Sequence, residues 1–317
     1  MANHKKTKKI LNDNWDDIVK LRESGTSLVD IASTYGISRQ TLSARFNKRA
    51  ITTSVEQPAL RILTLDIENA PMLSYTWGLW DQSISANMRV DGNRSYMMSI
   101  AMKWLGEDEV HYFETRTEDD SELTAKAIEF LDKADIVVGH NAKKFDVKKI
   151  NAYAALNGIP PPSPYRVVDT MLIAKRFFTF ERNTLDYLSH ALCTETKSGH
   201  GKFTGFELWS ECMKGNEEAW AEMQHYNKQD VVATEELYLK LRPWDKAHPN
   251  VSTLANSDKP KCISCGSTQL HEDGYSITNL SKFQRYKCEN CGGYSRGRTN
   301  LIPREYRDNL LAPIVNG

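Results

Sequence analysis

Apolar residues recur along the first fifty positions with the spacing of helices. Three blocks, at residues 15–19, 28–35 and 42–46, place apolar side chains at i, i+3 and i+4. This pattern predicts three short helices within residues 10–50. Ser38 precedes the third block and is the expected N-cap of its helix. Three short helices with a glycine-containing turn before the last one have the layout of a helix-turn-helix.

A different pattern follows a polar, linker-like stretch that ends at residue 59. Five segments have the density of apolar residues expected of buried strands: 61–68, 97–104, 109–115, 135–141 and 166–170. Helical patterns cover 121–133, with Ser121 as the expected cap, and 143–157, and helices continue through 217–241. Three strands, a helix, a strand, a helix and a last strand predict an α/β domain over residues 60–242. Its mixed five-stranded sheet would have the order of a ribonuclease H-like fold.

The charges balance overall but are unevenly distributed. The chain of 317 residues has 41 basic and 41 acidic side chains, and its 40% of hydrophobic residues excludes a disordered protein. The first 60 residues carry ten basic and six acidic side chains, and residues 259–317 carry nine and five. Positive ends around an acidic centre suit a polyanion bound near a site that gathers cations, although chance clustering gives the same counts.

The chain contains no apolar run that approaches the ~20 residues of a membrane span. Its first ten residues lack the apolar core of a secretion signal. We therefore expect a cytoplasmic protein that does not contact a membrane.

Acidic residues stand out at three places on the predicted elements. Asp66 and Glu68 lie two apart at the end of a strand, so both side chains project from one face. Asp146 closes the segment Asn-x-x-x-Phe-Asp, near the start of the helix that follows the fourth strand. Tyr226 and Asp230 lie four apart on one face of a helix. Each acid alone is more often a surface residue than a catalytic one.

Taken in order, Asp-Ile-Glu, Asn-x-x-x-Phe-Asp and Tyr-x-x-x-Asp resemble the three motifs of proofreading-type 3′-to-5′ exonucleases, which have a ribonuclease H-like fold. The resemblance covers residues 60–242. Residues 183–192 resemble that family's helix between its second and third motifs, and residues 77–82 and the stretch from 206 to 250 resemble exonucleases encoded by phages. The resemblance implies hydrolysis from a 3′ end to nucleoside 5′-monophosphates, with DNA favoured over RNA.

The same resemblance implies a pair of divalent cations. Two Mg²⁺ or Mn²⁺ ions roughly 3.5–4 Å apart can stabilise both the attacking and the leaving oxygen of a phosphodiester. These cations prefer oxygen ligands. The side chains that would hold them are the four acids of the motifs: Asp66, Glu68, Asp146 and Asp230.

The third motif leaves a choice between two residues. His225 precedes Asp230 by five positions and Tyr226 by four, so the segment satisfies both the tyrosine form and the histidine form of the family's pattern. A tyrosine hydroxyl would orient the attacking water, whereas an imidazole with a pKa near ~6.5 could take its proton. The i, i+4 spacing favours Tyr226, and a helix that begins later would favour His225.

Residues around the acids could hold the nucleic acid. Lys143 and Lys144, with Asn141 of the second motif, precede Asp146 and could meet phosphates. Trp77 and Trp80 lie after the first motif and could stack on a terminal base. The alternatives are a solvated lysine face and tryptophans of the core.

Residues 27–49 resemble the helix-turn-helix segment of resolvases, invertases and transposases. The resemblance implies DNA binding, with four side chains of the third helix facing outward to a groove: Arg39, Gln40, Ser43 and Arg45. The alternative is a small helical packing module.

Four of the six cysteines form two Cys-x-x-Cys pairs separated by 22 residues: Cys262, Cys265, Cys288 and Cys291. Paired cysteines in a reducing compartment indicate one structural Zn²⁺ rather than disulfides or free thiols. Residues 262–293 resemble zinc ribbons of transposases, and we expect the ribbon domain to cover residues 258–300. Arg285 and Lys287, with tyrosines interleaved, would offer charge and stacking surfaces to a strand, or the ribbon could serve only for protein docking.

These inferences predict a three-part nuclease: a helix-turn-helix, a two-metal exonuclease domain and a zinc ribbon. A transposase-like or resolvase-like nuclease is the nearest alternative, because the same three parts meet in those proteins. The spacing of Tyr226 to Asp230 favours the exonuclease. A DNA-binding regulator with an inactive nuclease core is a second alternative, and the presence of all four acids argues against it.

Overall fold

The structure is a computed structural model that describes residues 7, 10–50, 60–197, 201–254, 257, 259–312 and 314. The chain divides into two units, residues 1–57 and 58–317. Each unit is described by itself.

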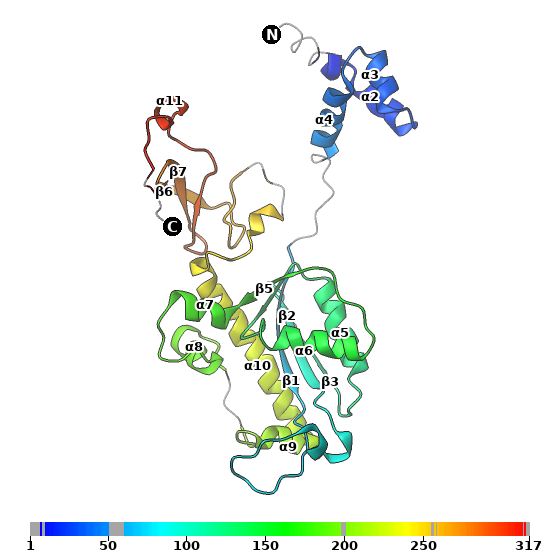
Figure 1. The fold of residues 1–317 in the computed structure, drawn as a ribbon, viewed down its shortest axis with the longest axis vertical. Helices are drawn as coiled ribbons and strands as arrows, with labels where there is room; N and C mark the ends of the chain where they lie inside the picture. The colour runs from blue at the N-terminus through cyan, green and yellow to red at the C-terminus, as the bar shows by residue number, and fades with distance from the viewer. Residues whose placement is uncertain are drawn as a thin grey trace. The chain divides into compact units, whose positions relative to one another are not determined.

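The first unit is helical. After a helical turn at residues 10–13, it contains α2 (Trp15–Glu23), α3 (Leu28–Thr34) and α4 (Arg39–Ala50) (Figure 1). The Ser38 hydroxyl accepts the Thr41 N–H at 3.1 Å and caps α4, as predicted. The helices pack on one another through seven buried apolar residues: Leu11, Trp15, Ile18, Ile31, Ala32, Ile37 and Leu42. This packing confirms the predicted three-helix module.

The second unit is built on the predicted mixed sheet. Its strands are β1 (Ile62–Asn69), β2 (Met97–Trp104), β3 (Val110–Glu114), β4 (Ile136–Gly139) and β5 (Arg166–Asp169). Their order in space is β3-β2-β1-β4-β5. The first three strands are antiparallel neighbours, and β4 and β5 run parallel to β1. The carboxyl ends of β1, β4 and β5 therefore meet at one edge, as the predicted α/β fold requires.

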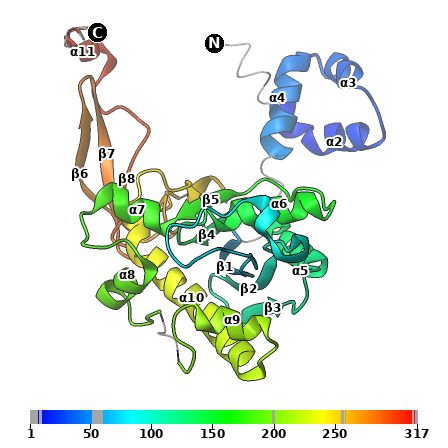
Figure 2. The same ribbon diagram turned by 60° about the horizontal axis from the view of Figure 1, so that its bottom comes forward.

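Helices cover both faces of this sheet, as Figures 1 and 2 show. They are α5 (Ser121–Asp132), α6 (Asp146–Leu156), α7 (Thr170–Phe177), α8 (Leu185–Leu192), α9 (Glu207–Met213) and α10 (Glu217–Leu241). Leu63, Leu65 and Ile67 of β1 pack against α5 and α6. Ile62, from the opposite face of β1, packs with α7, α8 and α10. The alternation along β1 therefore sends its even-numbered side chains toward α10.

The helices α5 and α6 begin differently from the prediction. Asp120, rather than Ser121, is the N-cap position of α5, and Ser121 is the first helical residue. Asp120 is fully buried, and its carboxylate accepts the Met97 N–H at 3.0 Å and the Asn157 amide at 2.9 Å. This side chain therefore joins β2 to the end of α6. The helix α6 begins at Asp146, three residues after its predicted start.

The cysteine-containing region forms a small sheet of its own. Its strands are β6 (Leu270–Thr278), β7 (Ser281–Cys288) and β8 (Tyr294–Arg296), all antiparallel. Four 3₁₀ turns and one short helix complete the second unit: η1 (Ala86–Met88), η2 (Val90–Gly92), η3 (Arg242–Trp244), η4 (Val251–Thr253) and α11 (Arg304–Arg307). Within the described part of the chain, every helix is too short or too polar to span a bilayer.

The position of Asp120 makes its loss costly. We expect Asp120→Ala to lower the free energy of unfolding by about 1–3 kcal/mol, because the Met97 N–H would stay buried without its acceptor. Urea denaturation measures this change. Asp108→Ala, which removes an exposed acid from the turn between β2 and β3, is the control and should stay within about 0.5 kcal/mol of the original chain. Equal stability of the two variants would contradict the tethering role.

Candidate functional site

The end of β1 directs two acids toward α10. The Asp66 carboxylate accepts a hydrogen bond from the Asn227 side-chain amide at 2.6 Å, and the Glu68 carboxylate accepts one from the Trp209 indole N–H at 3.1 Å. Ile67, between them, is buried on the opposite face against α5 and α6. The strand period of two therefore places both carboxylates on the face where α9 and α10 lie.

Asn227 is the residue that fixes this arrangement. It is fully buried in α10, and its amide nitrogen also donates to the Asp66 carbonyl at 3.2 Å. Its amide oxygen accepts the Ser99 hydroxyl of β2 at 3.1 Å. One side chain thus joins α10 to two neighbouring strands. The sequence analysis did not identify Asn227, since the partners that explain its burial lie more than 120 residues away.

One turn of α10 further on, Asp230 completes an acidic cluster. Its side chain is 4% exposed, and one carboxylate oxygen accepts a short hydrogen bond from the Lys197 ammonium. Carboxylate oxygens of Asp66, Glu68 and Asp230 all lie within 4.8 Å of one another. The structure therefore brings together three of the four predicted acids. Three oxygen donors at this spacing suit a hard divalent cation such as Mg²⁺ or Mn²⁺.

Asp146, the fourth predicted acid, lies next to this cluster rather than within it. It is buried at the first position of α6, and its carboxylate accepts the Ile67 N–H at 3.2 Å. Ile67 separates Asp66 from Glu68 in the chain, and the charge of Asp146 raises the pKa of Asp66. Asp146 therefore stands beside the other acids and adds to their negative potential.

Burial changes the protonation of these acids. It raises the pKa of Asp66 well above its usual value, and the neighbouring carboxylates add to the effect. Burial and the charge of Asp230 raise the pKa of Glu68 to about 8, and burial raises that of Asp146 to about 7. A group of acids this close cannot ionise fully at neutral pH without added positive charge.

Tyr226, rather than His225, faces the acids. Tyr226 is 8% exposed, its hydroxyl accepts a hydrogen bond from the Lys197 ammonium at 2.6 Å, and its ring lies edge-on to Trp209 with centroids 5.8 Å apart. His225 is exposed on the other side of the helix. Because α10 begins well before both residues, the i, i+4 relation places Tyr226 over Asp230.

The loop that precedes Asp146 is held by Asp169. The Asp169 carboxylate caps α7 through the N–H groups of Met171 and Leu172, and it also accepts the N–H groups of Asn141 and Lys143 at 3.0 and 3.1 Å. Asn141 has a φ of 69°, a conformation that asparagine tolerates better than most residues. Asp169 therefore fixes the backbone of Asn141, a residue that we predicted to bind nucleic acid.

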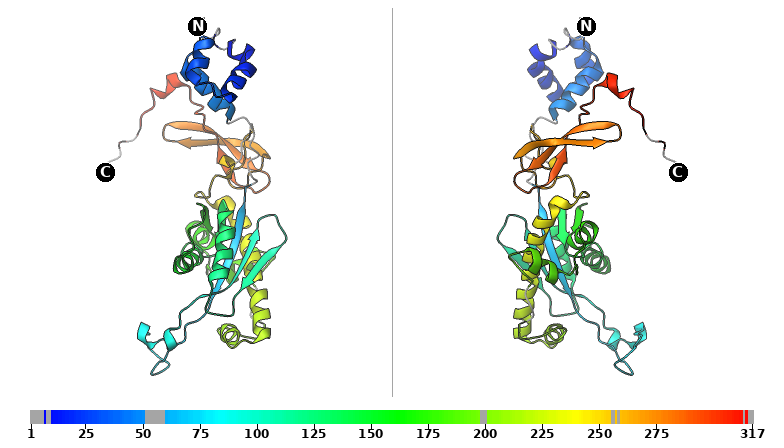
Figure 3. Two further views of the ribbon diagram at one scale, coloured as in Figure 1. Left: turned by 90° about the vertical axis from the view of Figure 1, so that its right-hand side faces the viewer. Right: turned by 90° about the vertical axis from the view of Figure 1, so that its left-hand side faces the viewer.

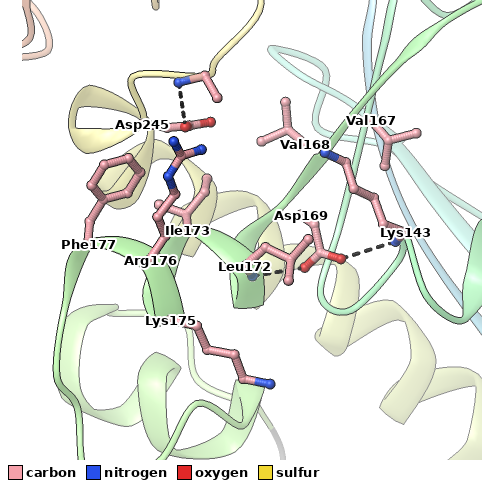
Figure 4. Close-up of a pocket in the computed structure, with 11 residues that line it drawn as sticks. Lys143, Val167, Val168, Asp169, Leu172, Ile173, Lys175, Arg176, Phe177 and Asp245 are labelled. Carbon is pink, nitrogen blue, oxygen red and sulfur yellow. Dashed lines mark hydrogen bonds between the residues drawn. The ribbon is translucent and has the colours of Figure 1, made fainter. Parts of the chain in front are cut away.

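The predicted lysines lie on the surface beside this loop. Lys143 and Lys144 are both exposed. Lys143 lines a pocket of about 380 Å³ between β5, α7 and the segment after α10, and Arg176 and Asp245 also line it (Figure 4). Asp169 itself lines the pocket, and none of the acids of the cluster is among the residues that line it.

A long excursion between β1 and β2 carries the predicted tryptophans. Its stem is closed by hydrogen bonds from the Tyr75 N–H to the Met88 carbonyl at 2.8 Å and from the Val90 N–H to the Leu73 carbonyl at 3.0 Å. Trp77 is 99% and Trp80 83% exposed in the loop that this stem closes. The excursion, drawn in cyan, projects from the body of the domain (Figure 3). The alternative that these tryptophans belong to the core is wrong.

The helix-turn-helix residues divide into two groups. Arg39 and Gln40 are exposed in the first turn of α4, and Ser43 is partly exposed. Arg45 is partly exposed, and its guanidinium also donates to the Asn12 side chain at 2.7 Å and lies 5.2 Å from the Trp15 ring centroid. A helical wheel alone cannot show these two contacts.

The four paired cysteines converge as predicted. Their sulfur atoms all lie within 4.8 Å of one another, and the Cys262–Cys291 and Cys265–Cys288 sulfur distances are both 3.6 Å. A tetrahedral ion with Zn–S bonds of about 2.3 Å needs sulfur atoms about 3.8 Å apart, so this donor set fits zinc.

Two glycines shape the cysteine loops. Gly266 and Gly292 each follow the second cysteine of a pair with a φ of 75°, and each N–H bonds the carbonyl of the first cysteine at 2.9 Å. A φ of this sign favours glycine.

The predicted ribbon cations lie on β7. Arg285 is held by Asp273, whose carbonyl accepts its Nε at 2.6 Å, and its guanidinium lies 5.4 Å from the Tyr294 ring centroid. Lys287 lies 5.9 Å from the same ring. Charge and aromatic surface therefore share one side of the small sheet.

Comparisons with known proteins identify two regions of the chain. A family described as the RNase H superfamily matches residues 88–242, and the helix-turn-helix domain of resolvase matches residues 8–42. The first match begins after β1, so Asp66 and Glu68 lie outside it. A search of curated proteins gives no match.

Among solved structures, the family B DNA polymerase from the hyperthermophilic archaeon Pyrobaculum calidifontis aligns with 20% sequence identity and a TM-score of 0.46. The alignment covers 59% of this chain and 25% of the polymerase chain, so this chain spans about a quarter of that protein's length.

The mixed sheet order and the first match agree on one fold, and the packing of α2 to α4 agrees with the second match. The second unit therefore has a ribonuclease H-like fold, and residues 8–42 are similar to the helix-turn-helix domain of resolvase.

Proposed function

We propose that this protein is a metal-dependent 3′-to-5′ exonuclease that acts on DNA. The observation that carries the proposal is the convergence of Asp66, Glu68 and Asp230 within 4.8 Å, with Asp146 on the neighbouring helix. The residue order of these acids and the position of Tyr226 match the three exonuclease motifs. The products would be nucleoside 5′-monophosphates.

Hydrogen bonds from groups of the protein orient these acids. Asn227 orients Asp66, Trp209 orients Glu68 and the Ile67 N–H orients Asp146. Two divalent ions, Mg²⁺ or Mn²⁺, when bound by these carboxylates and Asp230, would activate the attacking water and stabilise the leaving oxygen. The hydrogen bonds fix the carboxylates before the substrate arrives, which lowers the cost of reorganisation during the reaction.

Tyr226 would orient the attacking water. Its hydroxyl lies on the Asp230 side of the cluster, and its ring is held by Trp209. Burial, with the charge of Asp230, raises the pKa of Tyr226 to about 12. The hydroxyl therefore keeps its proton at neutral pH, and it would position water by hydrogen bonding rather than act as a base.

Other surfaces would hold the strand. Trp77 and Trp80 could stack on unpaired bases, since their rings are exposed at a loop that leaves the same strand as Asp66 and Glu68. Lys143 and Lys144 could contact phosphates beside Asp146. Arg39 and Gln40 begin the helix that would enter the major groove of DNA.

Stepwise degradation tests the reaction. With Mg²⁺, the protein should shorten a 5′-labelled DNA strand one nucleotide at a time, and Asp230→Asn should lower the rate at least about 100-fold, because it removes a ligand charge from the cluster. Denaturing gel electrophoresis and product chromatography give the rate and identify the mononucleotide. Asp108→Asn, at an exposed acid of the turn between β2 and β3, is the matched control.

Internal cuts without stepwise shortening would instead favour a transposase-like nuclease. Binding of DNA without turnover would favour a regulator.

The raised acid pKa values predict a pH dependence of stability without metal. Glu68 keeps its proton to about pH 8 in the folded state and to about pH 4.5 in the unfolded chain, so folding takes up protons between these values. For the zinc-loaded protein without Mg²⁺ or Mn²⁺, stability should therefore fall as the pH rises from 6 to 8.5. Each kcal/mol lost lowers the melting temperature by about 2–4 °C.

The Glu68→Gln variant tests whether Glu68 causes this dependence. Its melting temperature should change less with pH over the same interval. Mg²⁺ should also reduce the dependence, because bound cations favour the ionised carboxylates. Identical pH profiles of melting temperature for the two zinc-loaded proteins without Mg²⁺ or Mn²⁺ would contradict the raised pKa of Glu68.

The thiolate cluster predicts one Zn²⁺ per chain. Cys288→Ser should abolish stoichiometric zinc and unfold the small sheet, because four thiolates supply much of the folding energy of such a short module. Elemental analysis and hydrogen exchange of β6 and β7 measure the two effects. Cys193→Ser, outside the cluster, should retain zinc. Full protection of β6 and β7 in the zinc-free protein would contradict the structural role.

A further inference from the structure

The segment between α8 and α9 is fastened to the core immediately before it reaches the acids. The Glu236 carboxylate accepts the N–H groups of Thr194 and Glu195, both within 3.0 Å. Gln229 donates to the Thr196 carbonyl at 3.0 Å. The Lys197 N–H donates to the Ser189 hydroxyl at 3.0 Å. These contacts fix the backbone of Lys197 from two helices.

The ammonium of Lys197 lies at the acidic cluster formed by Asp66, Glu68 and Asp230, which we call the acidic centre. This ammonium donates to Asp230 and to the Tyr226 hydroxyl, and it lies 4.2 Å from the Tyr226 ring centroid. The Lys197 side chain is 21% exposed. This is therefore a largely desolvated ion pair, unlike the surface lysine pairs elsewhere in the chain, such as Lys202 with Glu218.

The Lys197 ammonium binds Asp230, a carboxylate that a divalent cation would also bind. Asp230 is one of the three acids whose oxygens lie within 4.8 Å of one another. Uncompensated, these buried charges repel, and a single positive charge among them lowers the repulsion. A divalent cation would also lower the repulsion among the carboxylates, and the positive charge of Lys197 would repel it. Lys197 and the cation thus compete for Asp230.

We propose that Lys197 is a built-in counter-ion of the acidic centre, which holds Asp230 and Tyr226 in place without divalent cation and releases Asp230 when a cation binds. This inference rests on the proposed function only in taking the three acids as the cation site. Lys197 is in this role a positioning residue. Its ion pair sets the concentration of divalent cation at which the centre loads.

Cation affinity in the absence of nucleic acid tests the inference. Zinc-loaded full-length protein is titrated with Mn²⁺ by calorimetry, and Asp230→Asn identifies the binding that belongs to the acids. Lys197→Met should bind Mn²⁺ about 10-fold more tightly than the original chain, because the site no longer has to give up an ion pair first. Without Mn²⁺ or Mg²⁺, the melting temperature of the zinc-loaded Lys197→Met variant should fall below that of the original chain, and saturating Mn²⁺ should restore it.

Two further variants serve as controls. Lys197→Arg keeps the positive charge and should bind Mn²⁺ within about 3-fold of the original affinity. Lys202→Met removes an exposed lysine from the same connection between α8 and α9, and it should change neither the Mn²⁺ affinity nor the melting temperature. If Lys197→Met does not fold, Lys197→Gln, which keeps a hydrogen-bond donor without the charge, should show the same tightening.

Unchanged or weaker Mn²⁺ binding by the uncharged variants would overturn the proposal. A raised KM for DNA with unchanged Mn²⁺ affinity would also overturn it, since Lys197 would then act on the substrate phosphate. The proposed function fails separately: tighter Mn²⁺ binding by Lys197→Met in a protein that degrades no nucleic acid would leave the counter-ion role intact and remove the exonuclease.

Discussion

Repulsion among buried carboxylates is the constraint on which the architecture of the second unit depends. Four acids gather at one end of a sheet, and burial raises the pKa of Asp66, Glu68 and Asp146. Groups of the protein donate hydrogen bonds to these carboxylates: Asn227, Trp209, the Ile67 N–H and Lys197. These donors come from α10, α9, β1 and the segment between α8 and α9. The acidic centre therefore forms only when these four elements, which are distant in the chain, pack together.

The sequence predicts the parts of this centre that follow from local geometry. The period of a strand places Asp66 and Glu68 on one face, and the period of a helix places Tyr226 over Asp230. The capping of α4 by Ser38 follows from the same kind of reasoning. All of these depend on residues within a few positions of one another, where the backbone alone dictates direction.

Long-range partners could not be predicted in this way. Asn227 binds Ser99 and Asp66, which lie 128 and 161 positions away. Lys197 meets Asp230 from a connection whose path between two helices has no regular period. Arg45 has the spacing of a groove-facing residue, and it also contacts Asn12 and the Trp15 ring at the surface of the module. Such contacts depend on the packing of whole elements rather than on local pattern.

The length of α10 has a consequence for the third motif. This helix runs for 25 residues, and Tyr226, Asn227 and Asp230 lie near its middle, several turns from either end. Helix termini fray readily, whereas interior turns that pack on a sheet open only with large parts of the domain. Fraying at the ends of α10 therefore does not reach Tyr226, Asn227 and Asp230. Thermal motion at the ends of α10 can thus leave the positions of these three side chains unchanged.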